Sequence, residues 1–266
     1  MPIAEANGQR LYYESHGEGE PLFCVMGLGA DHLAWILQTP VWSESRRVIV
    51  FDNRDVGQSS YSDADYEVSD MAADALALAD ALEIDSFDLL GMSLGGAISQ
   101  HMALTAPERI RTLTLVVTYA GLGRWGAARA RTLRRFVEKM TPEEHVDNMM
   151  YLCFSEEFFE NEQFAAAARE AMLSNPHPQR PEAFIRQLEA GSRHELRDRV
   201  GEIDLPTHVI GADRDVLVPC WKSEELAELI PGAKLTTLRA GHALNIEAAE
   251  AFNAAVLEFL AAPAPA

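Results

Sequence analysis

The chain has 266 residues, of which 48% are hydrophobic and 24% charged, a composition typical of a globular protein with a sizeable core. Its formal net charge of −19 disfavours nucleic acid and anionic membranes as partners, because both are polyanions. The three cysteines are odd in number and far apart, which excludes a disulfide framework and a zinc or redox motif. No secretory leader and no run of about 18 apolar residues occurs, so we expect a cytoplasmic protein without metal or cofactor.

Short apolar runs alternate with helix-like segments along most of the chain. The first two runs flank Asn7-Gly8, a pair typical of a β-hairpin turn. The next runs cover residues 21–27, 47–52, 87–91, 110–117, 206–211 and 233–238, and their almost continuous apolar character is typical of strands buried on both faces of a parallel sheet. Helices are predicted over residues 31–44, 67–83, 94–106, 221–230 and 247–261. This alternation predicts a doubly wound α/β fold.

One segment interrupts the alternation of strands and helices. Residues 120–203 contain no convincing strand and are rich in helix-forming residues, so we predict a helical insertion after the strand at 110–117. The chain would then divide into a core domain, residues 1–119 and 204–266, and a helical lid, residues 120–203. Because such an insertion lies over the edge of the sheet, some of its large apolar side chains should face the substrate.

The stretch GMSLGG, residues 91–96, places Ser93 between an apolar strand and a helix. Such a turn lifts one side chain above the sheet edge and leaves no room for its neighbours, which Gly91 and Gly95 make possible. The helix beginning at Leu94 directs free N–H groups and its positive dipole end toward the serine. G-x-S-x-G alone is common by chance, so its meaning depends on the remaining parts of a site.

A serine nucleophile needs a base and an orienting acid. Among the eight histidines, His242 lies in a loop directly after the last predicted strand, and we interpret the others as surface or packing residues. The loop after residues 206–211 offers Asp213 and Asp215; spacing excludes neither, but the apolar VLV after Asp215 favours it as a water-excluded carboxylate. Since loops at the carboxyl ends of parallel strands converge, we predict a catalytic triad of Ser93, Asp215 and His242.

Four motifs together resemble those of the α/β-hydrolase family. VMGLGADHLAW resembles its oxyanion loop, FDNRDVGQSS its D-x-R-G-x-G-x-S loop, GMSLGG its nucleophile elbow and GHALNIE its histidine loop. Within the family the chain is most similar to 3-oxoadipate enol-lactonases and related carboxylesterases. The resemblance implies a mostly parallel eight-stranded sheet, a helical lid after the sixth strand, and an oxyanion hole made by the backbone N–H groups of Leu28 and Leu94.

The chain departs from the family pattern at two positions. Met26 stands where the family often has histidine, which leaves the proposed backbone donors unaffected. Asp55 stands where the family often has glycine, and we expect it to alter the shape and polarity of its loop near the entrance to the site.

These features predict a cofactor-free serine hydrolase that cleaves a carboxylic ester or lactone of a small, mostly apolar substrate through an acyl-enzyme. Two alternatives retain the same triad: a small-molecule receptor or signalling protein with slow turnover, and a cofactor-free perhydrolase or haloperoxidase. An enol-lactone substrate would also need a cation for its free carboxylate, and the sequence singles out no lid arginine for this role. The preference among esters, lactones and thioesters stays open, as does the oligomeric state.

Overall fold

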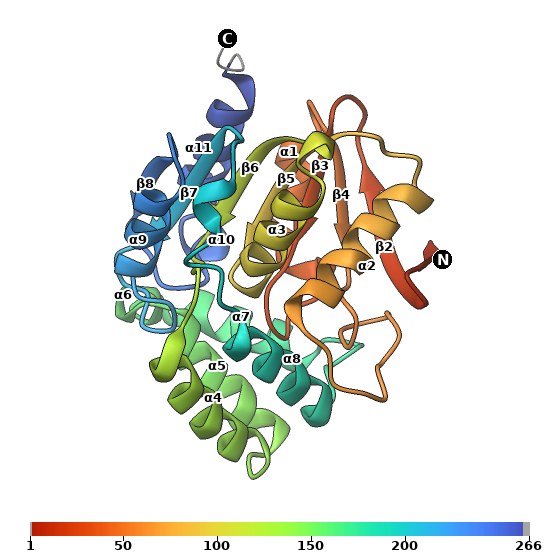
Figure 1. The fold of residues 1–266 in the computed structure, drawn as a ribbon. Helices are drawn as coiled ribbons and strands as arrows, with labels where there is room; N and C mark the ends of the chain where they lie inside the picture. The colour runs from red at the N-terminus through yellow and green to blue at the C-terminus, as the bar shows by residue number, and fades with distance from the viewer. Residues whose placement is uncertain (1, 263–266) are drawn as a thin grey trace.

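The computed structural model describes residues 2–262 of the chain (Figure 1). Within these residues, eight strands form one sheet in the order β1-β2-β4-β3-β5-β6-β7-β8. Strand β2 pairs in antiparallel fashion with both β1 and β4, and the remaining neighbours pair in parallel. This arrangement confirms the predicted α/β fold with a mostly parallel eight-stranded sheet. The strands are β1 (Ile3–Ala6), β2 (Gln9–His16), β3 (Pro21–Val25), β4 (Arg47–Phe51), β5 (Phe87–Met92), β6 (Ile110–Val116), β7 (Thr207–Ala212) and β8 (Lys234–Leu238).

The central strands are buried on both faces, which explains their continuous apolar runs. Successive residues alternate between two core clusters: in β3, Phe23 belongs to one cluster and Cys24 to the other. The first cluster packs under helices α2 (Val68–Ala81), α3 (Leu94–Thr105) and α9 (Trp221–Leu229). The second packs under α1 (Thr39–Trp42), α10 (Leu244–Glu247) and α11 (Ala249–Ala261). Among residues 2–262, no helix has both the length and the apolar character required to cross a membrane.

The sequence is correct about the N-terminal hairpin and wrong about the helix that follows β3. Asn7 and Gly8 both have positive φ, 50° and 75°, as a type I′ turn requires. The single helix predicted over residues 31–44 is instead a 3₁₀ turn, η1 (His32–Trp35), followed by the separate short helix α1. Pro40 explains the break, because a proline inside a helix removes an N–H donor and clashes with the preceding turn, whereas it is tolerated in the first turn.

Five helices follow one another between β6 and β7, where the insertion is predicted. They are α4 (Gly123–Val137), α5 (Pro142–Cys153), α6 (Glu156–Phe159), α7 (Glu162–Leu173) and α8 (Pro181–Arg193). These green to teal helices gather at one end of the sheet (Figure 1), and an isolated bridge pairs Gly121 with Glu195 at their base. The division into a core, residues 1–119 and 204–266, and a lid, residues 120–203, stays a prediction, and we use the word lid for these helices below.

Candidate active site

Ser93 lies at the tip of a sharp turn between β5 and α3. Its backbone angles are φ 56° and ψ −120°, a region in which a residue with a Cβ is strained. Two bonds hold the turn: the Ser93 N–H donates to the Val116 carbonyl at 2.8 Å, and the Thr118 hydroxyl donates to the Ser93 carbonyl at 2.7 Å. The strained conformation is therefore maintained by the neighbouring strand β6 and the residues that follow it.

The two glycines of the turn are required by close backbone contacts. A Cβ added at Gly91 would lie 2.3 Å from the carbonyl oxygen of Gly95, and one added at Gly95 would lie 2.0 Å from that of Val25. Real Cβ atoms do not approach other atoms so closely, and the blocking atoms belong to the backbone, which has little room to move. The G-x-S-x-G pattern is thus a steric requirement of this turn.

The structure brings together the three side chains that the sequence predicts as a triad. His242 lies in the loop between β8 and α10, and Asp215 lies in the loop after β7. His242 Nε2 is 2.9 Å from Ser93 Oγ, and His242 Nδ1 is 2.6 Å from Asp215 Oδ2. Because a carboxylate only accepts hydrogen bonds, Nδ1–H donates to Asp215, and Nε2 is left to accept the proton of the Ser93 hydroxyl.

Asp215, and not Asp213, is the aspartate that contacts the histidine. The side chain of Asp215 is completely buried against His242, and its Oδ1 accepts hydrogen bonds from the N–H groups of Leu217 and Val218 at 2.8 and 2.7 Å. The side chain of Asp213 is 44% exposed, and its nearest cation, on Arg214, is 3.9 Å away. The loop therefore presents one fixed carboxylate to the imidazole and leaves the other in solvent.

A second carboxylate, missed by the sequence analysis, fixes the histidine loop. Glu247 Oε2 accepts a hydrogen bond from the Gly241 N–H at 2.7 Å, and Oε1 accepts one from the Ser155 N–H at 2.6 Å. The Ala243 N–H donates to the Cys153 carbonyl of the lid at 2.7 Å. Glu247 lies at the end of α10, only six residues after Gly241, so its bond to Gly241 is a local one. Nothing local in the sequence predicts its bond to Ser155.

The other buried histidines have roles in packing or charge pairing. Burial lowers the pKa of His194 to about 3 and that of His208 to about 4, so both are neutral packing groups. His32 Nδ1 lies 2.7 Å from Asp52 Oδ1, but its Nε2 faces the Glu14 carboxylate at 3.6 Å rather than a nucleophile. Among residues 2–262, no group of three or more His, Cys, Asp and Glu side chains is arranged to hold a metal ion.

The two predicted oxyanion donors flank a close contact between the loop after β3 and the serine turn. A Cβ added at Gly27 would lie 2.9 Å from Ser93 Cβ and 3.4 Å from the backbone nitrogen of Leu94. Within residues 2–262, neither the Leu28 nor the Leu94 N–H donates to another group of the chain. Both are therefore available for a ligand, and Leu94 adds the dipole of α3.

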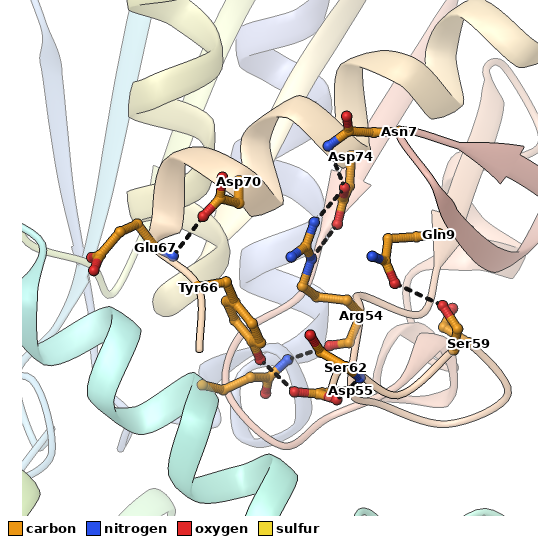
Figure 2. A network of polar contacts seen from close by, with 12 residues as sticks. Asn7, Gln9, Arg54, Asp55, Ser59, Ser62, Tyr66, Glu67, Asp70 and Asp74 are labelled. Atoms are coloured by element: carbon orange, nitrogen blue, oxygen red, sulfur yellow. Dashed lines mark hydrogen bonds and ion pairs between the residues drawn. The ribbon is translucent and has the colours of Figure 1, made fainter. Parts of the chain in front are cut away.

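Asp55 is fully buried and contacts the lid, and its expected effect on the entrance to the site stays a prediction. Its φ of 68° lies in the region that favours glycine, so the loop shape is one that glycine would adopt readily. The carboxylate accepts two hydrogen bonds from Arg186 of α8, at 2.9 and 3.0 Å. It accepts one more from each of the Tyr66 hydroxyl and the Ser62 N–H, which Figure 2 shows around Asp55. Its polarity thus serves to bind the lid.

Comparisons with known proteins agree with this architecture. A family model described as alpha/beta hydrolase fold matches residues 20–249. A curated relative from Rhizobium rhizogenes, named "Putative carbamate hydrolase RutD", is 31% identical over 263 residues, which cover 95% of this chain and 98% of the relative.

Two solved structures are similar over almost the whole chain. The enol-lactonase from Burkholderia xenovorans LB400 has a TM-score of 0.87 at 28% identity, with 98% of this chain and 100% of that chain covered. A hydrolase from Pseudomonas aeruginosa PA01 has a TM-score of 0.89 at 30% identity, with 98% of each chain covered. The chain therefore belongs to the alpha/beta hydrolase fold family.

Proposed function

We propose that the protein is a serine hydrolase that cleaves a carboxylic ester or lactone of a small, mostly apolar substrate. The observation that carries this proposal is the continuous chain of contacts from Ser93 Oγ through His242 to Asp215, with distances of 2.9 and 2.6 Å. A serine hydroxyl is a weak nucleophile unless a base removes its proton as it attacks. This chain of contacts supplies that base and the carboxylate that orients it.

The proposed reaction has two halves that use the same base. His242 Nε2 accepts the proton of Ser93 while Oγ attacks the carbonyl carbon, and Asp215 stabilises the resulting imidazolium. The N–H groups of Leu28 and Leu94 stabilise the oxyanion of the tetrahedral intermediate. The imidazolium then donates its proton to the leaving oxygen, and the acyl-enzyme forms. In the second half, His242 activates a water molecule that releases the acid and regenerates Ser93.

Apolar lid residues next to the oxyanion loop support a mostly apolar substrate. Leu28 packs against a cluster of buried lid side chains, which comprises Ala130, Leu133, Val137, Phe184 and Leu188. Binding sites for small molecules are lined mainly by such groups, with a few polar atoms that fix orientation. The solved relative described as an enol-lactonase agrees with cleavage of a cyclic ester.

Carbamate cleavage is a second candidate, favoured by the relative whose name refers to carbamate hydrolysis. Esters and carbamates share a carbonyl that Ser93 would attack. When the leaving group of a carbamate is an amine, His242 must protonate its nitrogen before the bond breaks. The same triad serves both reactions, so the leaving group decides between them.

A substrate panel with a covalent probe tests the proposal. A fluorophosphonate should label wild-type protein at Ser93, and p-nitrophenyl butyrate should be turned over continuously; lactones, thioesters and carbamates assayed in parallel identify the preferred acyl group. Steady turnover of a carbamate above that of every ester and lactone would favour the second candidate. A single burst without steady turnover would favour the receptor alternative, and absence of labelling at Ser93 would refute the proposal.

A further inference from the structure

A buried glutamine of lid helix α8 contacts the loop that carries the proposed oxyanion donor. Gln187 has 0% exposed surface, and its Oε1 accepts a hydrogen bond from the Gly29 N–H at 3.2 Å. Its Nε2 donates to the Arg54 carbonyl at 2.9 Å, and Gln179 Nε2 donates to its Oε1 at 3.1 Å. Because the Gly29 N–H can only donate and the Arg54 carbonyl can only accept, these partners fix which way the Gln187 amide is turned.

These bonds complete the restraint of one peptide group. The Leu28 N–H belongs to the peptide between Gly27 and Leu28. The peptide before it is held by Asn53, whose Nδ2 donates to the Met26 carbonyl at 2.8 Å, and the peptide after it is held by Gln187 through the Gly29 N–H. Asn53 follows β4 in the core, whereas Gln187 belongs to the lid. The direction of the Leu28 N–H therefore depends on one contact from the core, made by Asn53, and one from the lid, made by Gln187.

Packing alone does not explain a glutamine at this position. α8 is already held to the core by the ion pair between Arg186 and the buried Asp55. An apolar residue at position 187 would fill the same space but would leave the Gly29 N–H and the Arg54 carbonyl without these partners. Phe184 also packs close to the loop, since a Cβ added at Gly29 would lie 3.0 Å from its ring. The amide adds two directional hydrogen bonds to these contacts, and one of them fixes the orientation of the Leu28–Gly29 peptide.

We propose that Gln187 is a positioning residue, through which lid helix α8 completes the oxyanion hole. It touches no reacting atom and acts by holding the Leu28–Gly29 peptide, so that the Leu28 N–H points at the developing oxyanion. This inference rests on the proposed function and deepens it. It makes the lid a part of the catalytic geometry in addition to a cover over the site.

The expected effect is confined to the transition state. An oxyanion donor interacts weakly with the ground-state carbonyl and strongly with the tetrahedral oxyanion, so a misplaced donor lowers kcat and leaves KM nearly unchanged. Complete removal of such a donor costs about 100- to 1,000-fold in kcat. A loosened donor should cost less, and we expect a loss of roughly 10- to 100-fold for Gln187→Met.

The test measures kcat and KM for p-nitrophenyl butyrate together with the affinity for a trifluoromethyl ketone, whose serine adduct carries an oxyanion. Gln187→Met should lower kcat and the affinity for the ketone by similar factors, with KM within about twofold of wild type. The control is Arg193→Met in the same helix, which loses bonds to Glu67 and the Tyr66 carbonyl and should retain wild-type kcat.

The outcomes separate this inference from the proposed function. Wild-type kcat in a folded Gln187→Met protein overturns the inference, and so does an equal loss in Arg193→Met, because that would assign the effect to general docking of the lid. If Gln187→Met does not fold, Gln187→Asn decides, since its shorter amide cannot reach Gly29 and should give the same selective loss of kcat; unchanged kcat there overturns the inference as well. Absence of turnover and of Ser93 labelling in the wild type contradicts the proposed function itself, and the inference falls with it.

Discussion

The serine turn and lid helix α8 are both held by contacts with the core, but by different interactions. The turn depends on bare backbone: Gly95 approaches the Val25 carbonyl so closely that a Cβ would lie 2.0 Å from it. α8 depends on side chains, since Arg186 pairs with Asp55 and Gln187 bonds to Gly29. The first region tolerates no added atoms, whereas the second requires particular polar groups.

This difference separates the chemical steps that each region controls. In the proposed mechanism, the backbone of the turn sets the position of Ser93 relative to His242 and so controls the formation of the nucleophile. The side chains of α8 would then hold the oxyanion loop and so control how well the transition state is stabilised. Substitutions in the turn should therefore abolish the reaction, whereas substitutions in α8 should lower kcat in part or lower the free energy of unfolding.

The largest effect is expected for Ser93→Ala. Removing the nucleophile of a triad lowers kcat by roughly a factor of 10⁶. The backbone strain at position 93 is the same for alanine as for serine, so the fold should persist in circular dichroism and thermal unfolding. A folded Ser93→Ala protein that retains more than about a tenth of wild-type turnover would contradict the assignment.

Asp215→Asn comes next in expected effect. An asparagine can present its amide N–H to Nδ1 and so favour the wrong imidazole tautomer, which costs about 10⁴-fold in kcat in a comparable triad. The matched control is Asp213→Asn two residues earlier, where the side chain is 44% exposed and the loss should stay below about tenfold. The reverse order in purified, folded variants would show that Asp213 is the orienting acid.

Arg186→Met tests the lid side of the comparison through stability. The substitution leaves the fully buried Asp55 without its cation, and removing one partner of a buried ion pair costs about 3–5 kcal/mol of unfolding free energy. Adding Asp55→Gly removes the stranded carboxylate and suits the φ of 68°, so the double variant should recover a large part of the loss. Urea unfolding measures both.

The control for this experiment is an exposed ion pair of similar composition. Arg199 and Glu202 lie 3.0 Å apart with side chains more than half exposed, so water and salt screen their attraction. Arg199→Met should therefore leave the urea midpoint almost unchanged. Equal losses in Arg186→Met and Arg199→Met would mean that burial of Asp55 adds nothing to its ion pair.

The same difference explains which parts of the molecule the sequence predicts. The serine turn is encoded within six residues by glycines and an apolar strand, and the loops of Asp215 and His242 follow equally local patterns. The contacts of the lid join distant segments: Gln187 and Gly29 are 158 positions apart, and Arg186 and Asp55 are 131 apart. A single sequence contains no local pattern that pairs one arginine or glutamine with its partner at such separations, and the Asp55 carboxylate gives no indication that it will be buried.

The smallest expected effect is a pH dependence of stability that comes from His32. This residue directly follows the oxyanion loop and contacts Asp52 of the core. Burial of His32 opposes its protonation, but the hydrogen bond and charge of Asp52, with the charges of Asp31 and Glu14, outweigh burial and raise its pKa above 6.5. A raised folded-state pKa means that the folded protein binds this proton more tightly than the unfolded chain does. The stabilisation is therefore complete below about pH 6.5 and is lost as the pH rises through the folded-state pKa.

His208 provides a comparison of opposite sign, because burial lowers its pKa to about 4. There the unfolded chain binds the proton more tightly, so the folded state loses stability as the pH falls from about 6.5 toward 4. Urea unfolding of wild type, His32→Gln and His208→Gln at pH 5 and pH 8.5 measures both effects. The destabilisation caused by His32→Gln should be larger at pH 5, and that caused by His208→Gln should be larger at pH 8.5. If the destabilisation by His32→Gln were the same at both pH values, the His32–Asp52 contact would be a neutral hydrogen bond, and the oxyanion loop would be held on its core side by packing and hydrogen bonds alone.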